Sequence, residues 1–157
     1  MKKITSFLFF LVLTLSIQWI GSLFTFTSVN NWYQTLKKPA WNPPGWVFGF
    51  VWPLLYLMIA ISGWLIFIKI EPSKKKTLAL FTYGAGLLFN LAWTYSFFFL
   101  KSPVLALADL LILITLTSIN THLFLKLYRP SGLLLIPYLL WSLFALSLNL
   151  AILLLNP

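Results

Sequence analysis

The sequence has no cysteine and very few groups that could bind a metal or act as a nucleophile. Only two of its 157 residues are Asp or Glu, and one is His. Without cysteine the chain forms no disulfide, thiol nucleophile or thiolate metal site. So few carboxylates and imidazoles are also too few for a metal centre with several protein ligands. We therefore expect no metal and no resident cofactor.

Charge is scarce as well. Charged residues make up 8% of the chain, 61% of it is apolar, and the mean hydropathy is +0.94. Soluble domains carry about 25% charged residues, and a soluble fold of this size could not bury so much apolar surface. The composition predicts an integral membrane protein. The net charge of +9 would suggest nucleic acid for a soluble chain, but the cations are scattered between apolar runs, so we expect a lipid bilayer and no nucleic acid as partner.

Long uncharged runs predict five membrane-spanning helices. A helix needs roughly 20 apolar residues to cross the hydrocarbon core. Four longer runs carry no charge, and a fifth is interrupted only by Asp109. The runs do not alternate in polarity as barrel strands do. We predict an all-α bundle of five transmembrane helices, one domain over residues 1–157, with helices at about 4–27, 44–70, 77–100, 103–127 and 130–155 and a lid loop at 28–43.

Lysine and arginine indicate the orientation in the membrane. Eight of the eleven lie at the N-terminus, at 69–76 or at 126–129, and only Lys37, Lys38 and Lys101 lie on the other side. Because cytoplasmic loops carry the excess of cations, we expect a cytoplasmic N-terminus and a C-terminus outside. The short N-terminus without a transit peptide favours a bacterial plasma membrane.

Each predicted helix carries a polar or indole group at a similar depth. A rise of about 1.5 Å per residue places these groups roughly 9–15 Å below the outer surface. They are Gln18, Trp52, Asn90, Asp109 and Asn149. Polar groups at such a depth must face one another or a cavity. They form either a hydrogen-bond network that holds the bundle together or the polar part of a ligand pocket, and depth alone does not separate the two.

Aromatic stripes favour the pocket. Mixed stripes run along three predicted helices: Trp52 with Tyr56; Asn90 with Trp93 and Thr94; and Tyr138 with Trp141, Ala145 and Asn149. Stripes that face lipid would normally consist of Leu, Ile and Val. Faces that mix aromatic, amide and small residues suit a flat, mostly apolar ligand with a few polar edges.

The longest segment between predicted helices is Val29–Pro44, which reads VNNWYQTLKKPAWNPP. It is rich in aromatic residues and proline, unlike a flexible linker. We expect an ordered lid over the outer mouth of the bundle, with Lys37 and Lys38 available to an anionic group. The alternative is an interfacial loop without a ligand, in which Trp41 belongs to the aromatic belt at the membrane surface.

Many of these residues also follow a known pattern in order and spacing. They are Trp32-Tyr33, Leu36, Lys38-Pro39, Trp41, Pro43-Pro44, Trp46, Phe48, Val51-Trp52, Leu55-Tyr56, Met58, Asn90, Trp93, Phe97-Phe98, Asp109, Pro137-Tyr138, Trp141, Phe144-Ala145 and Leu148-Asn149. Over roughly residues 18–150 the chain resembles the TspO/MBR family of tryptophan-rich sensory proteins, which includes the mitochondrial translocator protein.

The resemblance implies a five-helix membrane bundle, usually a homodimer, with a pocket closed by the first loop. Such proteins bind porphyrins, such as protoporphyrin IX, and benzodiazepine- or isoquinoline-type drugs. The implied pocket residues are Tyr33, Trp52, Tyr56, Asn90, Trp93, Thr94, Asp109, Trp141 and Ala145, with Trp41, Lys37 and Lys38 in the lid. The basic residue that ends the sterol motif of animal members is absent, since nothing basic follows Arg129.

Two functions follow as hypotheses. The first is a tetrapyrrole-binding sensor or carrier. The second is an enzyme that degrades protoporphyrin IX oxidatively in light, for which Trp52 and Trp141 match the tryptophans tied to that activity in the family. A scaffold, or a transporter of another solute, is a further alternative. For a dimer, Thr82, Gly86 and Asn90 form a loose face of small residues, although the same stripe would also admit a ligand.

Overall fold

The computed structural model of the protein describes residues 2–157, and that part of the chain is all-helical. The elements are α1 (Lys2–Phe26), α2 (Trp32–Thr35), α3 (Gly45–Lys69), α4 (Lys74–Thr94), the π-helix η1 (Tyr95–Phe99), α5 (Pro103–Leu127) and α6 (Arg129–Leu155). The predicted all-α class is confirmed. Two elements were not predicted: α2 lies within the expected loop, and η1 replaces the last turn of the expected third helix.

Local sequence signals set several helix ends. The side chain of Ser73 accepts a hydrogen bond from the backbone N–H of Lys76 (3.2 Å) and so caps α4. Ser102 caps α5 in the same way, and Pro103 follows it in the first turn. Such caps satisfy N–H groups that have no partner inside the helix. Lys101, with φ of 53°, makes the left-handed step between η1 and α5.

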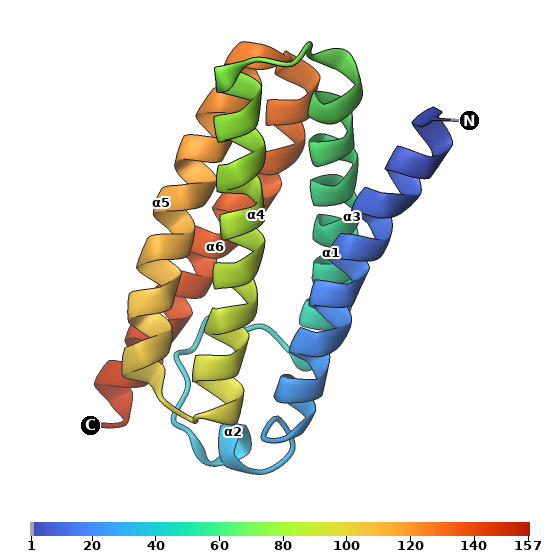
Figure 1. Ribbon diagram of the computed structural model, residues 1–157. Helices are drawn as coiled ribbons and strands as arrows, with labels where there is room; N and C mark the ends of the chain where they lie inside the picture. Colours follow the sequence, from blue (N-terminus) through green and yellow to red (C-terminus); the bar gives the residue numbers. More distant parts are fainter. Residues whose placement is uncertain (1) are drawn as a thin grey trace.

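The five long helices pack as a closed ring in the order α1–α3–α6–α5–α4 (Figure 1). Residues 27–44, with α2, cross one end of the ring, where the C-terminus also lies. We call these residues the lid and this end the lid end. The N-terminal turn of α1, residues 70–73 and the turn at Tyr128 lie at the opposite end, which we call the basic end. Among the side chains that the structure describes, its cations are Lys3, Lys69, Lys74, Lys75, Lys76, Lys126 and Arg129.

Small polar residues join the helices toward the basic end. The hydroxyl of Ser62 on α3 donates to the carbonyl of Ser131 on α6 (2.8 Å), and the Ser131 hydroxyl donates back to the carbonyl of Ser62 (2.7 Å). The amide of Asn120 on α5 donates to Thr82 on α4 (3.0 Å). Thr82 and Asn90 are both buried, so the small-residue stripe suggested for a dimer packs largely inside the bundle.

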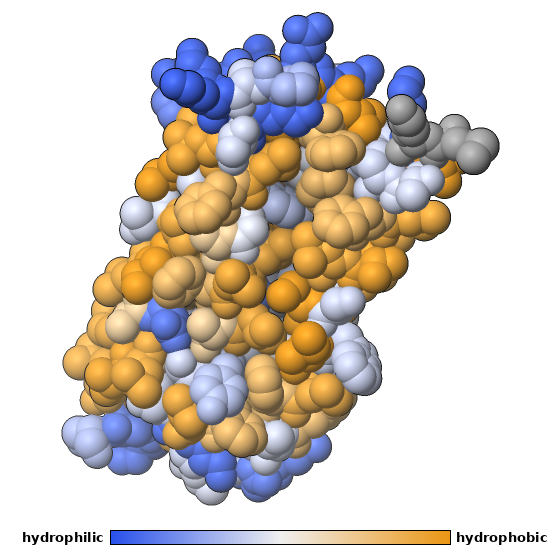
Figure 2. Space-filling model, viewed as in Figure 1, coloured by the Kyte–Doolittle hydropathy of each residue, from blue (hydrophilic) through white to orange (hydrophobic). Residues whose placement is uncertain are grey.

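The surface has the polarity expected of a protein in a bilayer. Figure 2 shows a broad hydrophobic zone between two hydrophilic ends. Over the described residues, α1, α3, α5 and α6 are long and apolar enough to cross a membrane. Helix α4 is not among these four: three lysines occupy its first turn, and Thr82, Tyr83 and Asn90 interrupt the apolar run that follows.

Candidate ligand pocket under the lid

A cavity of about 760 Å³ lies within the lid end of the bundle. Residues from α1, the lid, α3, α4, η1 and α6 line it. They include Gln18, Ser22 and Thr25 of α1, Tyr33, Lys38 and Asn42 of the lid, Phe48, Gly49, Trp52 and Tyr56 of α3, Trp93, Thr94, Phe97 and Phe98 of α4 and η1, and Trp141, Phe144, Ala145 and Asn149 of α6. Small-molecule sites typically occupy about 300–1,000 Å³ and combine apolar walls with a few polar groups, and this cavity does both.

Three indoles form the wall of the cavity. The ring of Trp52 lies 6.5 Å from that of Trp93, with the two planes 31° apart. The same ring lies 6.4 Å from Trp141 in an edge-to-face arrangement at 89°. One turn deeper on α3, Tyr56 packs against Trp52 at 5.7 Å. The wall therefore offers two aromatic faces inclined at 31° to each other, those of Trp52 and Trp93, and a third, that of Trp141, perpendicular to Trp52.

A hydrogen-bond junction supports the floor. The hydroxyl of Tyr56 on α3 donates to the side-chain oxygen of Asn90 on α4. The amide nitrogen of Asn90 donates to the hydroxyl of Tyr138 on α6 (2.9 Å). Asn90 is 1% exposed and lies behind the cavity surface. Its amide thus fixes Tyr56, which does line the cavity, by linking three helices.

A second amide fixes the wall. The indole N–H of Trp93 donates to the side-chain oxygen of Asn149 on α6 (3.1 Å). The amide nitrogen of Asn149 in turn donates to the carbonyl of Pro103 at the start of α5 (2.9 Å). Because an indole N–H has no second donor to offer, Trp93 presents only its apolar ring to the cavity.

The π-helix connects the wall to the lid. In η1 the N–H of Leu100 bonds to the carbonyl of Tyr95, five residues back. The carbonyl of Phe98 accepts a hydrogen bond from the hydroxyl of Ser28 in the lid (2.7 Å). The ring of Phe97 contacts Tyr33 of α2 edge-to-face at 6.2 Å. Wide turns of this kind occur often at functional sites, and here the turn holds two cavity phenylalanines against the lid.

Contacts within the lid order its polar groups. The ammonium of Lys38 lies 4.7 Å from the centre of the Tyr33 ring, a cation–π distance. The Tyr33 hydroxyl donates to the side-chain oxygen of Asn42 (3.1 Å). Burial raises the pKa of Tyr33 above its ordinary value of 10.0, so this phenol stays neutral at physiological pH and keeps its proton to donate.

The C-terminus holds the lid down. The side-chain oxygen of Asn156 accepts the backbone N–H of Lys37 (2.9 Å), and its amide nitrogen donates to the backbone carbonyl of Lys37 (2.9 Å). The same nitrogen bonds to the carbonyl of Ile152 (2.7 Å). One side chain thus ties the middle of the lid to the last turn of α6.

The cavity brings together most of the residues expected in the pocket. Those that line it are Tyr33, Lys38, Trp52, Tyr56, Trp93, Thr94, Trp141 and Ala145. Four others are not among its lining residues. Asn90 lies behind the floor, Asp109 accepts a hydrogen bond from Ser96 on η1, Trp41 is 57% exposed, and Lys37 contacts Asn156 through its backbone.

The expected set lacked the polar residues of α1. Ser22 and Thr25 line the cavity together with Gln18, and the three follow the i, i+4, i+7 spacing of one helix face. That spacing is visible in the sequence, although an argument from depth alone selects only Gln18. No spacing pattern in the sequence marks Asn42 or Asn156, because their hydrogen bonds form only once the lid has folded back over the bundle.

Comparison with known proteins agrees with this pattern. The TspO/MBR family matches residues 9–155. The "Tryptophan-rich protein TspO" of Archaeoglobus fulgidus is 39% identical over 90% of this chain and 91% of its own length. The protein of the same name from Chlorobaculum tepidum is 34% identical over 99% of both chains, and the human "Translocator protein" is 33% identical over 83% of this chain and 78% of its own.

The chain belongs to the TspO/MBR family. Family membership and the four long apolar helices make it an integral membrane protein. The resemblance noted in the sequence is confirmed. In this TspO/MBR protein the segment that carries most of the resemblance, residues 32–58, supplies part of the lid and of the cavity wall.

Proposed function

We propose that this TspO/MBR protein binds a porphyrin-type tetrapyrrole such as protoporphyrin IX in the cavity under the lid, and that it acts in tetrapyrrole sensing or transport. Benzodiazepine- or isoquinoline-type drugs would occupy the same cavity. The observation that carries the proposal is a cavity of about 760 Å³ whose wall holds three indoles. That combination suits a flat aromatic ligand better than a small polar solute.

Different residues of the cavity contact different parts of the proposed ligand. Trp52 offers a face on which a macrocycle stacks, and Trp141, which stands at 89° to Trp52, contacts the same macrocycle edge-to-face. Each contact contributes about 1 kcal/mol. Lys38 at the mouth pairs with a propionate, and its ammonium already lies beside the Tyr33 ring. On α1, Gln18 and Ser22 supply the polar groups for the other edges of the ligand.

The same proposal includes the arrangement in the membrane. We take α4 with η1 as the fifth span, because together they run from Lys74 to Phe99 beside four helices that are long and apolar enough to cross. Its lysines then lie at the membrane surface with the other cations of the basic end. This end faces the cytoplasm, the C-terminus lies outside, and the membrane is a bacterial plasma membrane. A homodimer is proposed from the family resemblance.

A titration in the dark tests the binding proposal. Protoporphyrin IX is added to the purified protein while tryptophan fluorescence is followed. We expect saturable quenching at micromolar porphyrin and, in Trp52→Phe, an affinity about fivefold weaker, the factor for a loss of about 1 kcal/mol. Trp19→Phe is the matched control, because Trp19 is 65% exposed on α1 and is not a lining residue. Linear quenching that never saturates would mean partition into detergent and would refute the proposal.

One observation favours light-dependent degradation of the porphyrin as a second candidate. Trp52 and Trp141 both line the cavity and lie 6.4 Å apart. With the bound porphyrin as photosensitiser and dioxygen as oxidant, an indole of the wall would serve as redox partner. A new absorbing product that forms in light, is absent in the dark and is lost in Trp141→Phe supports this activity. Equal bleaching with and without the protein rules it out.

A further inference from the structure

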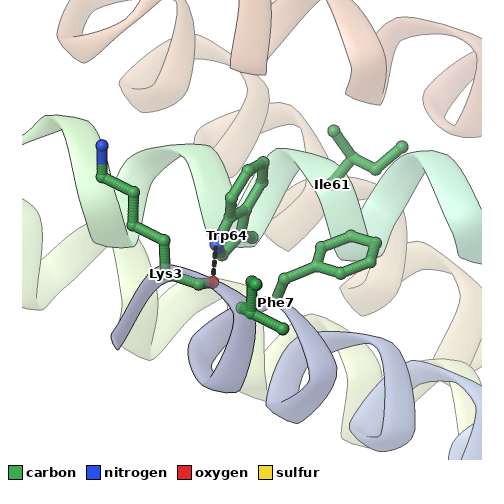
Figure 3. Close-up of a pocket in the computed structure, with 5 residues that line it drawn as sticks. Lys3, Phe7, Ile61 and Trp64 are labelled. Carbon is green, nitrogen blue, oxygen red and sulfur yellow. Dashed lines mark hydrogen bonds between the residues drawn. The ribbon is translucent and has the colours of Figure 1, made fainter. Parts of the chain in front are cut away.

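A second cavity lies at the basic end of the bundle, far from the lid. It has a volume of about 530 Å³ and is lined by Lys3, Ile4 and Phe7 of α1 and by Ile61 and Trp64 of α3. Figure 3 shows the Trp64 indole between the N-terminal turns of α1 and helix α3, with Phe7 and Ile61 beyond it and the Lys3 side chain on its other side. Apart from Lys3, the residues that line this cavity have apolar or aromatic side chains.

The indole of Trp64 shapes this groove. Its N–H donates to the backbone carbonyl of Lys3 (3.2 Å) and to the hydroxyl of Ser6 (3.3 Å). The ring of Phe7 contacts it edge-to-face at 5.2 Å. These contacts hold the indole in a fixed position between the two helices. The N-terminal turns of α1 diverge from α3 at this point (Figure 1). Since α1 meets the indole N–H, the rest of the ring is left as apolar wall.

The positive charge around this groove favours a ligand with an anionic group. Lys3 forms its rim, and the surrounding end of the bundle carries, among the side chains that the structure describes, six further cations against one acid, Glu71. One of these cations is engaged, because the ammonium of Lys76 donates to the carbonyls of Phe67 and Ile70 (both 2.7 Å). The rim therefore favours an anionic group, while the interior favours a hydrocarbon chain.

We propose that the groove between α1 and α3 binds an anionic phospholipid of the surrounding leaflet. One acyl chain lies against Trp64, Phe7 and Ile61, and the phosphate and headgroup lie at the ammonium of Lys3. This site is separate from the cavity under the lid and does not depend on the tetrapyrrole proposal. A neutral phospholipid fills the same apolar groove but gains less at the rim.

Quenching by brominated lipids tests the site, because bromine on an acyl chain quenches a nearby indole. The full chain is reconstituted in phosphatidylcholine vesicles that contain increasing fractions of brominated phosphatidylglycerol or brominated phosphatidylcholine. The contribution of Trp64 is the difference between the wild type and Trp64→Phe. We expect half-maximal quenching of this contribution at an about fivefold lower fraction of the anionic lipid, the factor for about 1 kcal/mol from one lysine at an anionic surface.

Two variants locate the effect. In Lys3→Gln the curves for the two lipids should coincide, whereas the matched control Lys101→Gln, at the lid end, should leave the anionic preference unchanged. Ile61→Phe fills the groove while keeping the reporter, and should lower quenching by both lipids. This variant and Lys3→Gln remain informative from total fluorescence if Trp64→Phe does not fold.

Three outcomes overturn the proposal. One is equal quenching of wild-type Trp64 by the two lipids. Another is an anionic preference that survives Lys3→Gln. The third is quenching that disappears as the ratio of protein to lipid rises, which would place a second copy of the chain in the groove.

Discussion

The junction at Asn90 gives a sharp test of how the pocket floor is held. Asn90 is 1% exposed, and its amide links Tyr56 on α3 to Tyr138 on α6. The variant Asn90→Leu keeps a side chain of similar size but removes both hydrogen bonds. Tyr56 then loses the acceptor of its proton while its hydroxyl remains in a buried environment.

Two estimates of the free-energy cost apply to this variant. A buried polar group left without its partner costs about 1–3 kcal/mol. Hydrogen bonds between membrane helices contribute only about 0.6 kcal/mol on average, because polar groups in the unfolded state also find partners in the membrane. We expect the larger cost here, since the junction is buried and the replaced amide served two phenols at once. Asn90→Leu should therefore lower the free energy of unfolding by about 2 kcal/mol.

A double-mutant cycle separates the lost bond from the change in shape. Tyr56→Phe removes the other partner, so the double variant Asn90→Leu/Tyr56→Phe has no unpaired hydroxyl on α3. We expect its destabilisation to be at least about 1 kcal/mol smaller than the sum of the two single variants. The free energy of unfolding of all four proteins is measured by circular dichroism at increasing concentrations of a denaturing detergent. Additive effects would refute the reasoning, because they would mean that the two side chains do not interact.

Three further changes have expected outcomes. Asn156→Ala removes both bonds to the backbone of Lys37, so bound porphyrin should dissociate about five- to tenfold faster in stopped-flow measurements, with stability nearly unchanged. In Gly132→Ala the new methyl group would lie 2.4 Å from a backbone nitrogen of α5, so we expect loss of folded protein. The control Gly84→Ala, whose methyl group would have nothing within 4 Å, should be expressed at the wild-type level. Ser62→Ala removes the bond that the Ser62 hydroxyl donates to α6 and keeps the one that Ser131 returns to the backbone. It should lower the melting temperature slightly, for a cost of about 0.6–1.7 kcal/mol.

The long helices could be predicted because the length of an apolar run and the nature of its flanking residues decide them. Helices were predicted to begin at about 44 and 103, and α3 and α5 begin at Gly45 and Pro103. The short elements could not be predicted in this way. Helix α2 has only four residues, too few for a periodic pattern, and η1 differs from a regular helix by a single widened turn. That turn contacts the lid through Phe98 and Ser28, which lie 70 residues apart in the sequence.

The pocket shows a similar division. Spacing along one helix placed Trp52 with Tyr56 on one face, and the structure brings both to the cavity. Depth alone was less informative, because the rise of a helix fixes how deep a residue lies but not the direction in which it points. Asp109 shares the depth of the cavity residues and yet bonds to Ser96 on the neighbouring η1. Rotation about the helix axis is set by packing, which one helix does not reveal.

The position of the cavity follows from the sizes of the residues along the ring of helices. Toward the basic end small residues allow close approach: a methyl group at Gly63 would lie 2.7 Å from Tyr83 of α4 and 2.9 Å from Phe10 of α1. Toward the lid end large indoles lie between α3, α4 and α6, and the amide of Asn149 fixes the indole of Trp93. The ring of helices is therefore tight around Gly63 and open at the lid end. On this view the volume under the lid depends on helix separation, so Gly63→Ala should perturb the cavity from a distance by pushing α1 away from α3.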